Sequence, residues 1–275
     1  MVQPSKVTGA SLPSGSTGTT TPAGAAPPGA MLAVRGLHKH FGGVQAVNNA
    51  SFEVAEGYLF GLIGPNGAGK STALKMVGGA FRPDAGTVLF DGVDIREMRL
   101  SDLRHLIAYV PQDGFLFSTS VGNNIAFSQP EVVPDAIEAA ATQSRIWDTI
   151  QAMPEGIDTL IGERGIMLSG GQRQRTAIAR ALIKSEAKML ILDDSLSAVD
   201  TGTESEILHM LRRVRGKKTT IIAAHRLSAV RDADQIIVLD KGVIVQRGSH
   251  RDLIRQPGLY RDLYRIQTGG ASLHA

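Results

Sequence analysis

A short apolar segment that runs into a glycine-rich loop limits the folds open to this chain more than any other feature. Residues 58–63 have the nearly continuous apolar pattern of a strand that is buried on both faces. The next eight residues, from Gly64 to Ser71, match the pattern G-x-x-x-x-G-K-[ST], and residues 72–78 have a helical pattern. This order predicts an α/β fold in which helices flank a mixed core sheet and the loop lies at the carboxyl end of a strand.

The residue types in this loop suit the binding of phosphate. Glycines let backbone N–H groups turn toward phosphate oxygens, and the start of the following helix adds its positive end. We expect Lys70 to contact the β- and γ-phosphates and the Ser71 hydroxyl to bind Mg²⁺. A purely structural glycine-rich turn is the alternative, and the strand–loop–helix context argues against it. The predicted nucleotide-binding residues are Gly64, Pro65, Asn66, Gly67, Ala68, Gly69, Lys70, Ser71 and Thr72.

A second buried-strand pattern, residues 188–192, ends in the acids Asp193 and Asp194. In P-loop NTPases an acid at this strand end holds Mg²⁺, and Asp193 fits that role. Asp194 then lies where a carboxylate can orient or deprotonate an attacking water. The two acids could instead cap the following turn, but that alternative is weak beside a phosphate loop.

The sequence Leu168-Ser169-Gly170-Gly171-Gln172 opens a strongly helical stretch, residues 173–184. Two glycines and a serine at a helix start form an anion site. Here the chain resembles the ATP-binding domains of ABC proteins, in which this signature segment caps the γ-phosphate of ATP held by a partner domain. The resemblance implies ATP and Mg²⁺ as ligands and a head-to-tail dimer.

Further segments follow in the family's order from Met31 to about Gln267. Residues 107–110 have the pattern of a short strand, and Gln112 shortly after it resembles the glutamine that senses Mg²⁺ and couples to a membrane domain. His225 resembles the switch histidine that contacts the γ-phosphate. Phe41 falls where the family stacks an aromatic ring on adenine, although a core role for Phe41 is the alternative. The segment that resembles the loop along the dimer interface consists of Ser197, Ala198, Val199 and Asp200.

Asp194 departs from the family pattern, because active ABC ATPases usually carry Glu there. Aspartate is shorter by one methylene, which is about 1.5 Å of reach, and a misplacement of about 1 Å can cost on the order of a hundredfold in rate. We therefore expect slow hydrolysis at the site built on this chain's own phosphate loop. An intact signature beside a weakened acid resembles one half of a heterodimeric exporter, whereas a homodimer would place Asp in both sites.

The two parts of the chain resemble different branches of the family. Residues 31–85 resemble the ATPases of branched-chain amino-acid importers, whereas residues from about 86 onward resemble exporters, including residues 91–95, 110–117 and 162–165. A mosaic joined near residues 80–90 is one interpretation, and ordinary divergence within the family is the other.

Composition limits the remaining possibilities. Residues 1–30 are dominated from Gly9 onward by Gly, Pro, Ser, Thr and Ala, so we expect a disordered tail before an ordered domain at 31–275. The formal net charge of +3 leaves no basic footprint for nucleic acid. No cysteine is present, which excludes disulfides and fits a reducing compartment. No apolar run approaches the roughly 20 residues that span a bilayer.

The leading prediction is therefore ATP binding and hydrolysis that powers transport through a membrane domain on another chain. The domain would lie in the cytoplasm, on the inner face of the membrane, with residues 114–168 as a helical subdomain that presents the signature. Residues 235–239 and 243–246 predict a closing hairpin, and Ser249 is expected to cap one final amphipathic helix. One rival is a soluble ABC ATPase of DNA repair or translation, which the single cassette without a coiled-coil insertion disfavours. The other is an ATP-binding module with little or no turnover.

Overall fold

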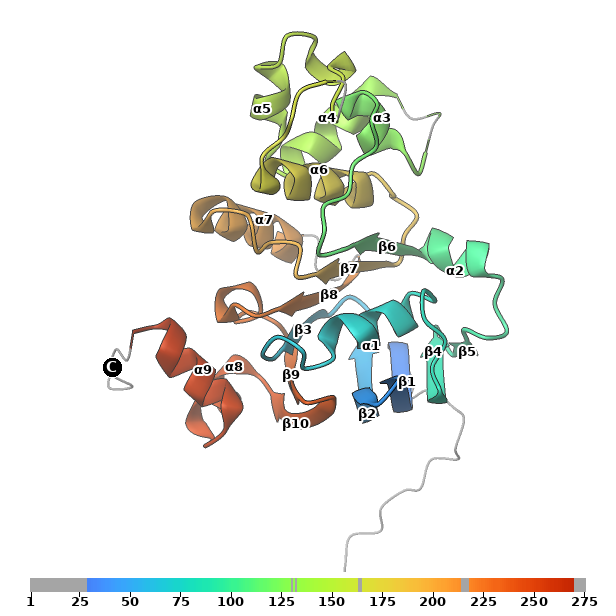
Figure 1. The fold of residues 1–275 in the computed structure, drawn as a ribbon, viewed down its shortest axis with the longest axis vertical. Helices are drawn as coiled ribbons and strands as arrows, with labels where there is room; N and C mark the ends of the chain where they lie inside the picture. The colour runs from blue at the N-terminus through green and yellow to red at the C-terminus, as the bar shows by residue number, and fades with distance from the viewer. Residues whose placement is uncertain (1–28, 130, 132, 163–164, 214–217, 270–275) are drawn as a thin grey trace, which may run out of the picture.

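The computed structural model describes residues 29–129, 131, 133–162, 165–213 and 218–269. Its centre is a six-stranded sheet in the order β10-β9-β3-β8-β7-β6 (Figure 1). Neighbouring strands of this sheet are parallel, except that β10 runs antiparallel to β9, so the predicted mixed α/β core is confirmed. The strands are β3 (Leu59–Ile63), β6 (Ile107–Val110), β7 (Met189–Asp193), β8 (Thr219–Ala224), β9 (Gln235–Asp240) and β10 (Val243–Gly248).

A second, antiparallel sheet in the order β2-β1-β4-β5 was not predicted. Its long hairpin turns at Gly42, whose φ of 57° suits glycine. The first strand begins at Ala30, one residue before the predicted start of order. The strands are β1 (Ala30–Phe41), β2 (Val44–Ala55), β4 (Ala85–Phe90) and β5 (Val93–Asp94).

The helix α1 (Lys70–Val77) lies between the two sheets, where Leu74 and Met76 are fully buried. Because strand side chains alternate, β7 sends Ile191 into this core and Leu192 into the core on the opposite face. The opposite face is covered by α6 (Gly170–Leu182) and α7 (Thr201–Arg213).

A helical lobe rises above this body in Figure 1. It consists of α3 (Val121–Ala126), α4 (Pro134–Gln143), α5 (Trp147–Gln151) and the short η1 (Gly156–Asp158). The lobe has its own apolar core, to which Ala179 and Ile183 also contribute. Ala177 and Ile178 of the same helix α6 belong to the core between the sheet and helices α6 and α7. The helix α6 therefore joins the lobe to the body.

The chain after the β9–β10 hairpin forms two helices, α8 (His250–Arg255) and α9 (Leu259–Gln267), where the sequence predicted one final helix. Ser249 caps α8 as predicted. The prediction was wrong beyond that helix because Pro257 disfavours a helical backbone at the preceding residue, and Gln256 is extended with a ψ of 137°. The remaining helices are α2 (Leu100–Leu106) and η2 (Leu227–Ala229).

The predicted disordered tail, residues 1–30, lies outside the described residues up to position 28. Within the described ranges, no helix has both the length and the apolar character needed to cross a membrane.

Candidate nucleotide-binding site

The glycine-rich loop follows β3 and ends where α1 begins at Lys70. Two of its glycines leave no room for a side chain. A Cβ atom on Gly64 would lie 2.2 Å from the Leu239 carbonyl oxygen, and one on Gly69, whose φ is 98°, would lie 2.2 Å from the Ala46 carbonyl oxygen. The loop is therefore pressed against β9 and β2, with its backbone at the carboxyl edge of the sheet.

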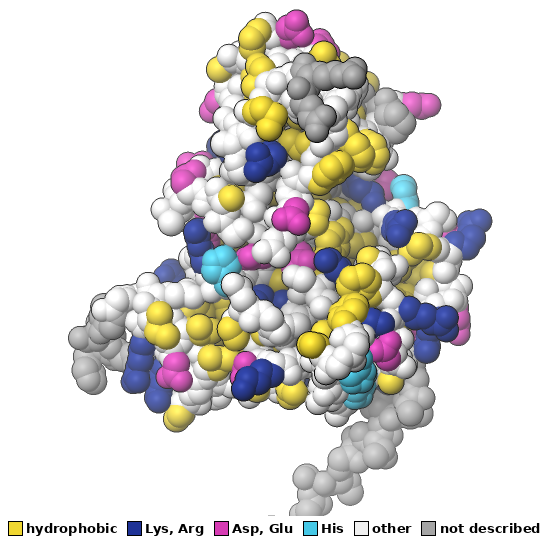
Figure 2. Space-filling model, viewed as in Figure 1, with side chains coloured by type: hydrophobic (Ala, Val, Ile, Leu, Met, Phe, Trp, Pro, Cys, Tyr) yellow, Lys and Arg dark blue, Asp and Glu magenta, His cyan; other side chains and the backbone are white. Residues whose placement is uncertain are grey.

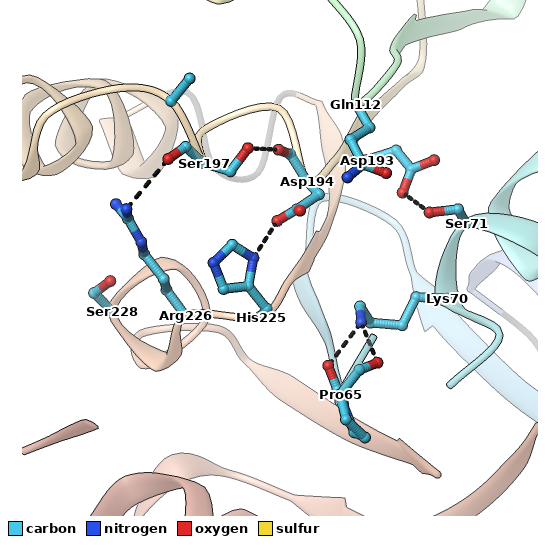
Figure 3. Close-up of polar contacts among 12 residues, drawn as sticks. Pro65, Lys70, Ser71, Gln112, Asp193, Asp194, Ser197, His225, Arg226 and Ser228 are labelled. Carbon is cyan, nitrogen blue, oxygen red and sulfur yellow. Dashed lines mark hydrogen bonds and ion pairs between the residues drawn. The ribbon is translucent and has the colours of Figure 1, made fainter. Parts of the chain in front are cut away.

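Lys70 is buried, and its ammonium group folds back over the loop. Its Nζ donates to the carbonyl oxygens of Gly64 at 2.7 Å and Pro65 at 3.0 Å (Figure 3). Burial lowers the pKa of Lys70, and the nearby carboxylates of Asp194 and Asp193 oppose that shift. This placement puts a cation beside the loop that is predicted to bind phosphate.

Asp193 lies at the end of β7, and both of its carboxylate oxygens are hydrogen-bonded. The Ser71 hydroxyl donates to Oδ1 at 2.7 Å, and the Tyr109 hydroxyl donates to Oδ2 at 2.8 Å. Burial, reinforced by the Asp193 carboxylate, raises the pKa of Tyr109 far above its ordinary value. The structure thus brings together the predicted Mg²⁺ ligands Ser71 and Asp193.

Tyr109 was missed by sequence reasoning, although the strand that carries it was predicted. The available signal was its position on β6, which pairs in parallel with β7, so that Tyr109 lies opposite Ile191. Only the pairing of these strands shows that the ring can reach the carboxylate two residues further along.

Asp194 and His225 form a pair at the ends of the adjacent strands β7 and β8. His225 Nδ1 lies 2.8 Å from Asp194 Oδ1 (Figure 3). The Asp194 backbone N–H donates to the Ala223 carbonyl oxygen at 2.8 Å. Asp194 has a left-handed backbone with a φ of 49°, which aspartate tolerates better than most residues. The pair fits a proton acceptor held by an imidazole.

A cleft of about 450 Å³ opens over the glycine-rich loop. Gln112 and Asp194 border this cleft, so two further predicted residues lie at the loop. Its wall also includes residues that sequence reasoning missed, at the start of β2: Val44, Gln45 and Ala46.

Phe41 does not line this cleft. Its side chain is 45% exposed, and its ring packs edge-on against Phe81 with 5.5 Å between the ring centroids. The adenine-stacking role of Phe41 stays a prediction. The alternative of a core role is wrong, because Phe41 is exposed.

The signature segment lies at the start of α6. The Ser169 hydroxyl accepts from the Gln172 backbone N–H at 3.2 Å, and the Gln172 side chain accepts from the Ser169 N–H at 2.8 Å. These reciprocal bonds form a capping box that fixes the helix start. None of the residues Leu168–Gln172 lines the cleft over the chain's own phosphate loop. The role of the signature toward a partner domain stays a prediction.

The predicted interface loop is tied to α6 by Gln174, another residue that sequence reasoning missed. The Gln174 side chain donates to Ser197 Oγ at 3.2 Å and accepts from the Ala198 backbone N–H at 2.9 Å. Ser197 Oγ in turn donates to the Asp194 carbonyl oxygen at 2.9 Å. Val199 is buried, and Asp200 accepts from the backbone N–H of Thr203 at the start of α7.

Basic and acidic side chains are interspersed over the face shown in Figure 2, with no single basic patch on that face. The exporter-like residues 162–165 include positions 163 and 164, which lie outside the described residues.

The sequence and the fold of the chain match proteins of one family. Residues 47–197, more than half of the chain, match the family model described as "ABC transporter". The chain is 47% identical over 226 residues to the ATP-dependent lipid A-core flippase of Burkholderia thailandensis, covering 82% of this chain and 37% of that protein. It is 46% identical over 228 residues to the multidrug resistance-like ATP-binding protein MdlA of Escherichia coli, covering 83% of this chain and 38% of that protein.

A solved bacterial Atm1-family ABC exporter with ATP bound has a similar fold. The TM-score is 0.82 at 38% identity, and the match covers 93% of this chain and 44% of that one. The chain thus spans less than half the length of these relatives.

The matched stretch of 226 residues is longer than the whole of residues 86–275, so it includes part of the segment 31–85. The likeness to these relatives is therefore not confined to the later part of the chain, and the mosaic stays a prediction. The family match covers the phosphate loop, the acids of β7 and the signature, and the chain belongs to the ABC transporter family.

Proposed function

We propose that this ATPase domain closes with a second ATP-binding domain around ATP and Mg²⁺ and thereby powers transport through a membrane domain outside these 275 residues. The observation that carries the proposal is the convergence of predicted groups at one edge of the sheet. Lys70 follows β3, Asp193 ends β7, and His225 follows β8. The cation, the acid and the imidazole thus lie at the carboxyl ends of three adjacent strands, on one edge of the sheet.

The donor set fits Mg²⁺. The Ser71 hydroxyl and the Asp193 carboxylate are hard oxygen ligands that already lie 2.7 Å apart, and Gln112 borders the same cleft. Magnesium in nucleotide sites is held by one or two protein oxygens together with phosphate oxygens. Bound there, the ion would neutralise charge on the transferred phosphoryl group. Lys70 would hold the phosphates from the loop side.

Asp194 would orient or deprotonate the attacking water, and His225 would hold that carboxylate in place through the 2.8 Å contact. Because Asp is shorter than the usual Glu, the proposed turnover at this site is slow. The intact signature would complete the site of a partner that carries the stronger acid. A heterodimer with one fast site is therefore the assembly we propose.

Transport in the export direction is supported by the relatives, which are named as flippases and exporters. The domain would then lie against the cytoplasmic face of the membrane. The importer-like features of residues 31–85 argue for the opposite direction, but part of that segment also matches the flippase relatives.

Phosphate release by the purified chain tests the proposal. We expect ATP-dependent release that Lys70→Ala abolishes, because the variant loses the cation beside the loop. Lys188→Ala is the matched control, since Lys188 forms a surface ion pair with Asp91 and should retain the parent rate. A Lys70→Ala variant as active as its parent would contradict the assignment of this site. Silence of both the parent and Asp194→Glu, with ATP still bound, would favour an ATP-binding module without turnover.

A further inference from the structure

The last residue of α9, Gln267, contacts the backbone segment that carries His225. Its Nε2 donates to the His225 carbonyl oxygen at 2.7 Å, and its Oε1 accepts from the Leu227 backbone N–H at 2.8 Å. One planar amide thus bonds to the backbone on both sides of Arg226. These residues are 42 and 40 positions apart in sequence from Gln267.

The helix that carries Gln267 is anchored in the core. Tyr260 is fully buried among residues of the sheet and α7, and Leu263 and Tyr264 pack against the same core. The helix closes directly after Gln267, where the Thr268 N–H and hydroxyl both donate to the Tyr264 carbonyl oxygen, at 2.9 and 2.7 Å. Gln267 is therefore presented by a fixed element.

The side chain of Arg226 is held from another direction. Its guanidinium donates to the Ser197 carbonyl oxygen at 3.2 Å (Figure 3). It also donates to Glu204 Oε2 at 3.0 Å. Glu204 is almost fully buried in α7 and also accepts from the Ser228 hydroxyl at 2.8 Å. The arginine side chain is thus fixed by α7 and the interface loop, whereas the flanking backbone is fixed by α9.

His225 links the backbone segment that Gln267 holds to the carboxylate of Asp194. Its carbonyl group is held by Gln267, and its ring contacts the Asp194 carboxylate at 2.8 Å. Because backbone and ring belong to one residue, any displacement of that backbone moves the imidazole relative to the carboxylate. Rates in enzyme sites are steeply sensitive to such displacements.

We propose that Gln267 is a positioning residue for ATP hydrolysis. It holds the His225 backbone so that the imidazole keeps its contact with the Asp194 carboxylate. The inference rests on the proposed function, since it assumes that His225 acts in hydrolysis. It extends the catalytic apparatus to the C-terminal helix, whose docking then affects turnover.

The test compares Gln267→Ala with Gln246→Ala in the full chain. Gln246 is a matched control because its Oε1 accepts from the Tyr260 backbone N–H at 3.0 Å, so it holds the other end of the same helix, away from His225. Single-turnover hydrolysis, with the protein in excess over ATP and at a concentration above its Kd for ATP, measures even slow rates. Hydrogen–deuterium exchange at the Leu227 amide reports directly on the restraint.

We expect Gln267→Ala to slow hydrolysis about tenfold, to change ATP affinity less than about twofold, and to speed exchange at Leu227 about tenfold. Gln246→Ala should leave all three near the parent values. An unchanged hydrolysis rate for Gln267→Ala beside a slow His225→Ala would overturn this inference alone, and so would equal slowing in Gln246→Ala. A His225→Ala variant as fast as the parent would overturn the assigned role of His225 and this inference with it.

Discussion

At the scale of single residues, the most informative position is Asp194. Its carboxylate is bound to His225, borders the cleft over the phosphate loop, and rests on a left-handed backbone. These contacts fix the direction of the Asp194 side chain. Its length is therefore the property that a substitution at this position can test.

We predict that Asp194→Glu raises the rate of phosphate release, by roughly tenfold to a hundredfold, because the added methylene restores about 1.5 Å of reach. Asp194→Asn keeps the length of the side chain but removes the base, and it should be slower than the parent. Steady-state phosphate release decides the matter. A glutamate variant no faster than the parent would mean that reach does not limit the rate, and the inference of a heterodimer would lose its basis.

Tyr109 supports Asp193 through the hydrogen bond to Oδ2. Tyr109→Phe removes the donor from a carboxylate that is only 1% exposed, so we expect the free energy of unfolding to fall by about 1–3 kcal/mol. Urea unfolding measures the change. The matched control is Tyr58→Phe at a half-exposed site, for which a change within about 0.5 kcal/mol is expected. Equal effects at the two positions would show that the hydrogen bond to Asp193 contributes nothing particular.

At the scale of elements, helix caps fix several boundaries. The boundary of α8 depends on Ser249, which exchanges hydrogen bonds with Asp252 in a capping box. This cap lies at the start of α8, whereas Gln267 ends α9, and the cap lines no part of the nucleotide cleft. Removing the cap should therefore change stability without changing activity.

We predict that Ser249→Ala lowers the free energy of unfolding by about 1 kcal/mol, which corresponds to a fall in Tm of about 2–4 °C for a domain of this size. Ser249→Thr retains a hydroxyl acceptor and should stay close to the parent. Thermal unfolding provides the comparison, and phosphate release should be equal in all three proteins at 25 °C. A parent-like Tm for the alanine variant would mean that the backbone alone fixes the start of α8.

At the scale of the whole molecule, ligand binding should stabilise the body of the domain, because the cleft is built from the ends of several strands and the start of α1. ATP at about a hundred times its Kd should add about 2.7 kcal/mol to the free energy of unfolding, or roughly 5–10 °C in Tm. Lys70→Ala should lose most of that shift, and Lys188→Ala should keep it. A full shift in Lys70→Ala would place ATP binding elsewhere on the molecule.

The local sequence pattern was sufficient to predict the elements whose geometry depends on residues close in sequence. The glycine-rich loop, the apolar run before Asp193 and the signature at α6 are contiguous segments whose geometry follows from residues a few positions apart. For the same reason the sequence predicted the β9–β10 hairpin and the cap at Ser249. The motifs also identified Lys70, Ser71 and Asp194 at the cleft, and the family resemblance identified Gln112, whereas Val44, Gln45 and Ala46 of the cleft wall were missed.

Only the tertiary structure decided which residues support that cleft. Tyr109, Gln174 and Gln267 act across 84, 24 and 42 positions of sequence, and each uses a common polar side chain that no local motif marks. The same holds for the antiparallel second sheet, whose β1–β4 pairing joins distant segments. Long-range pairing depends on how the whole core packs, so a single sequence specifies the participants of such contacts without identifying the pairs.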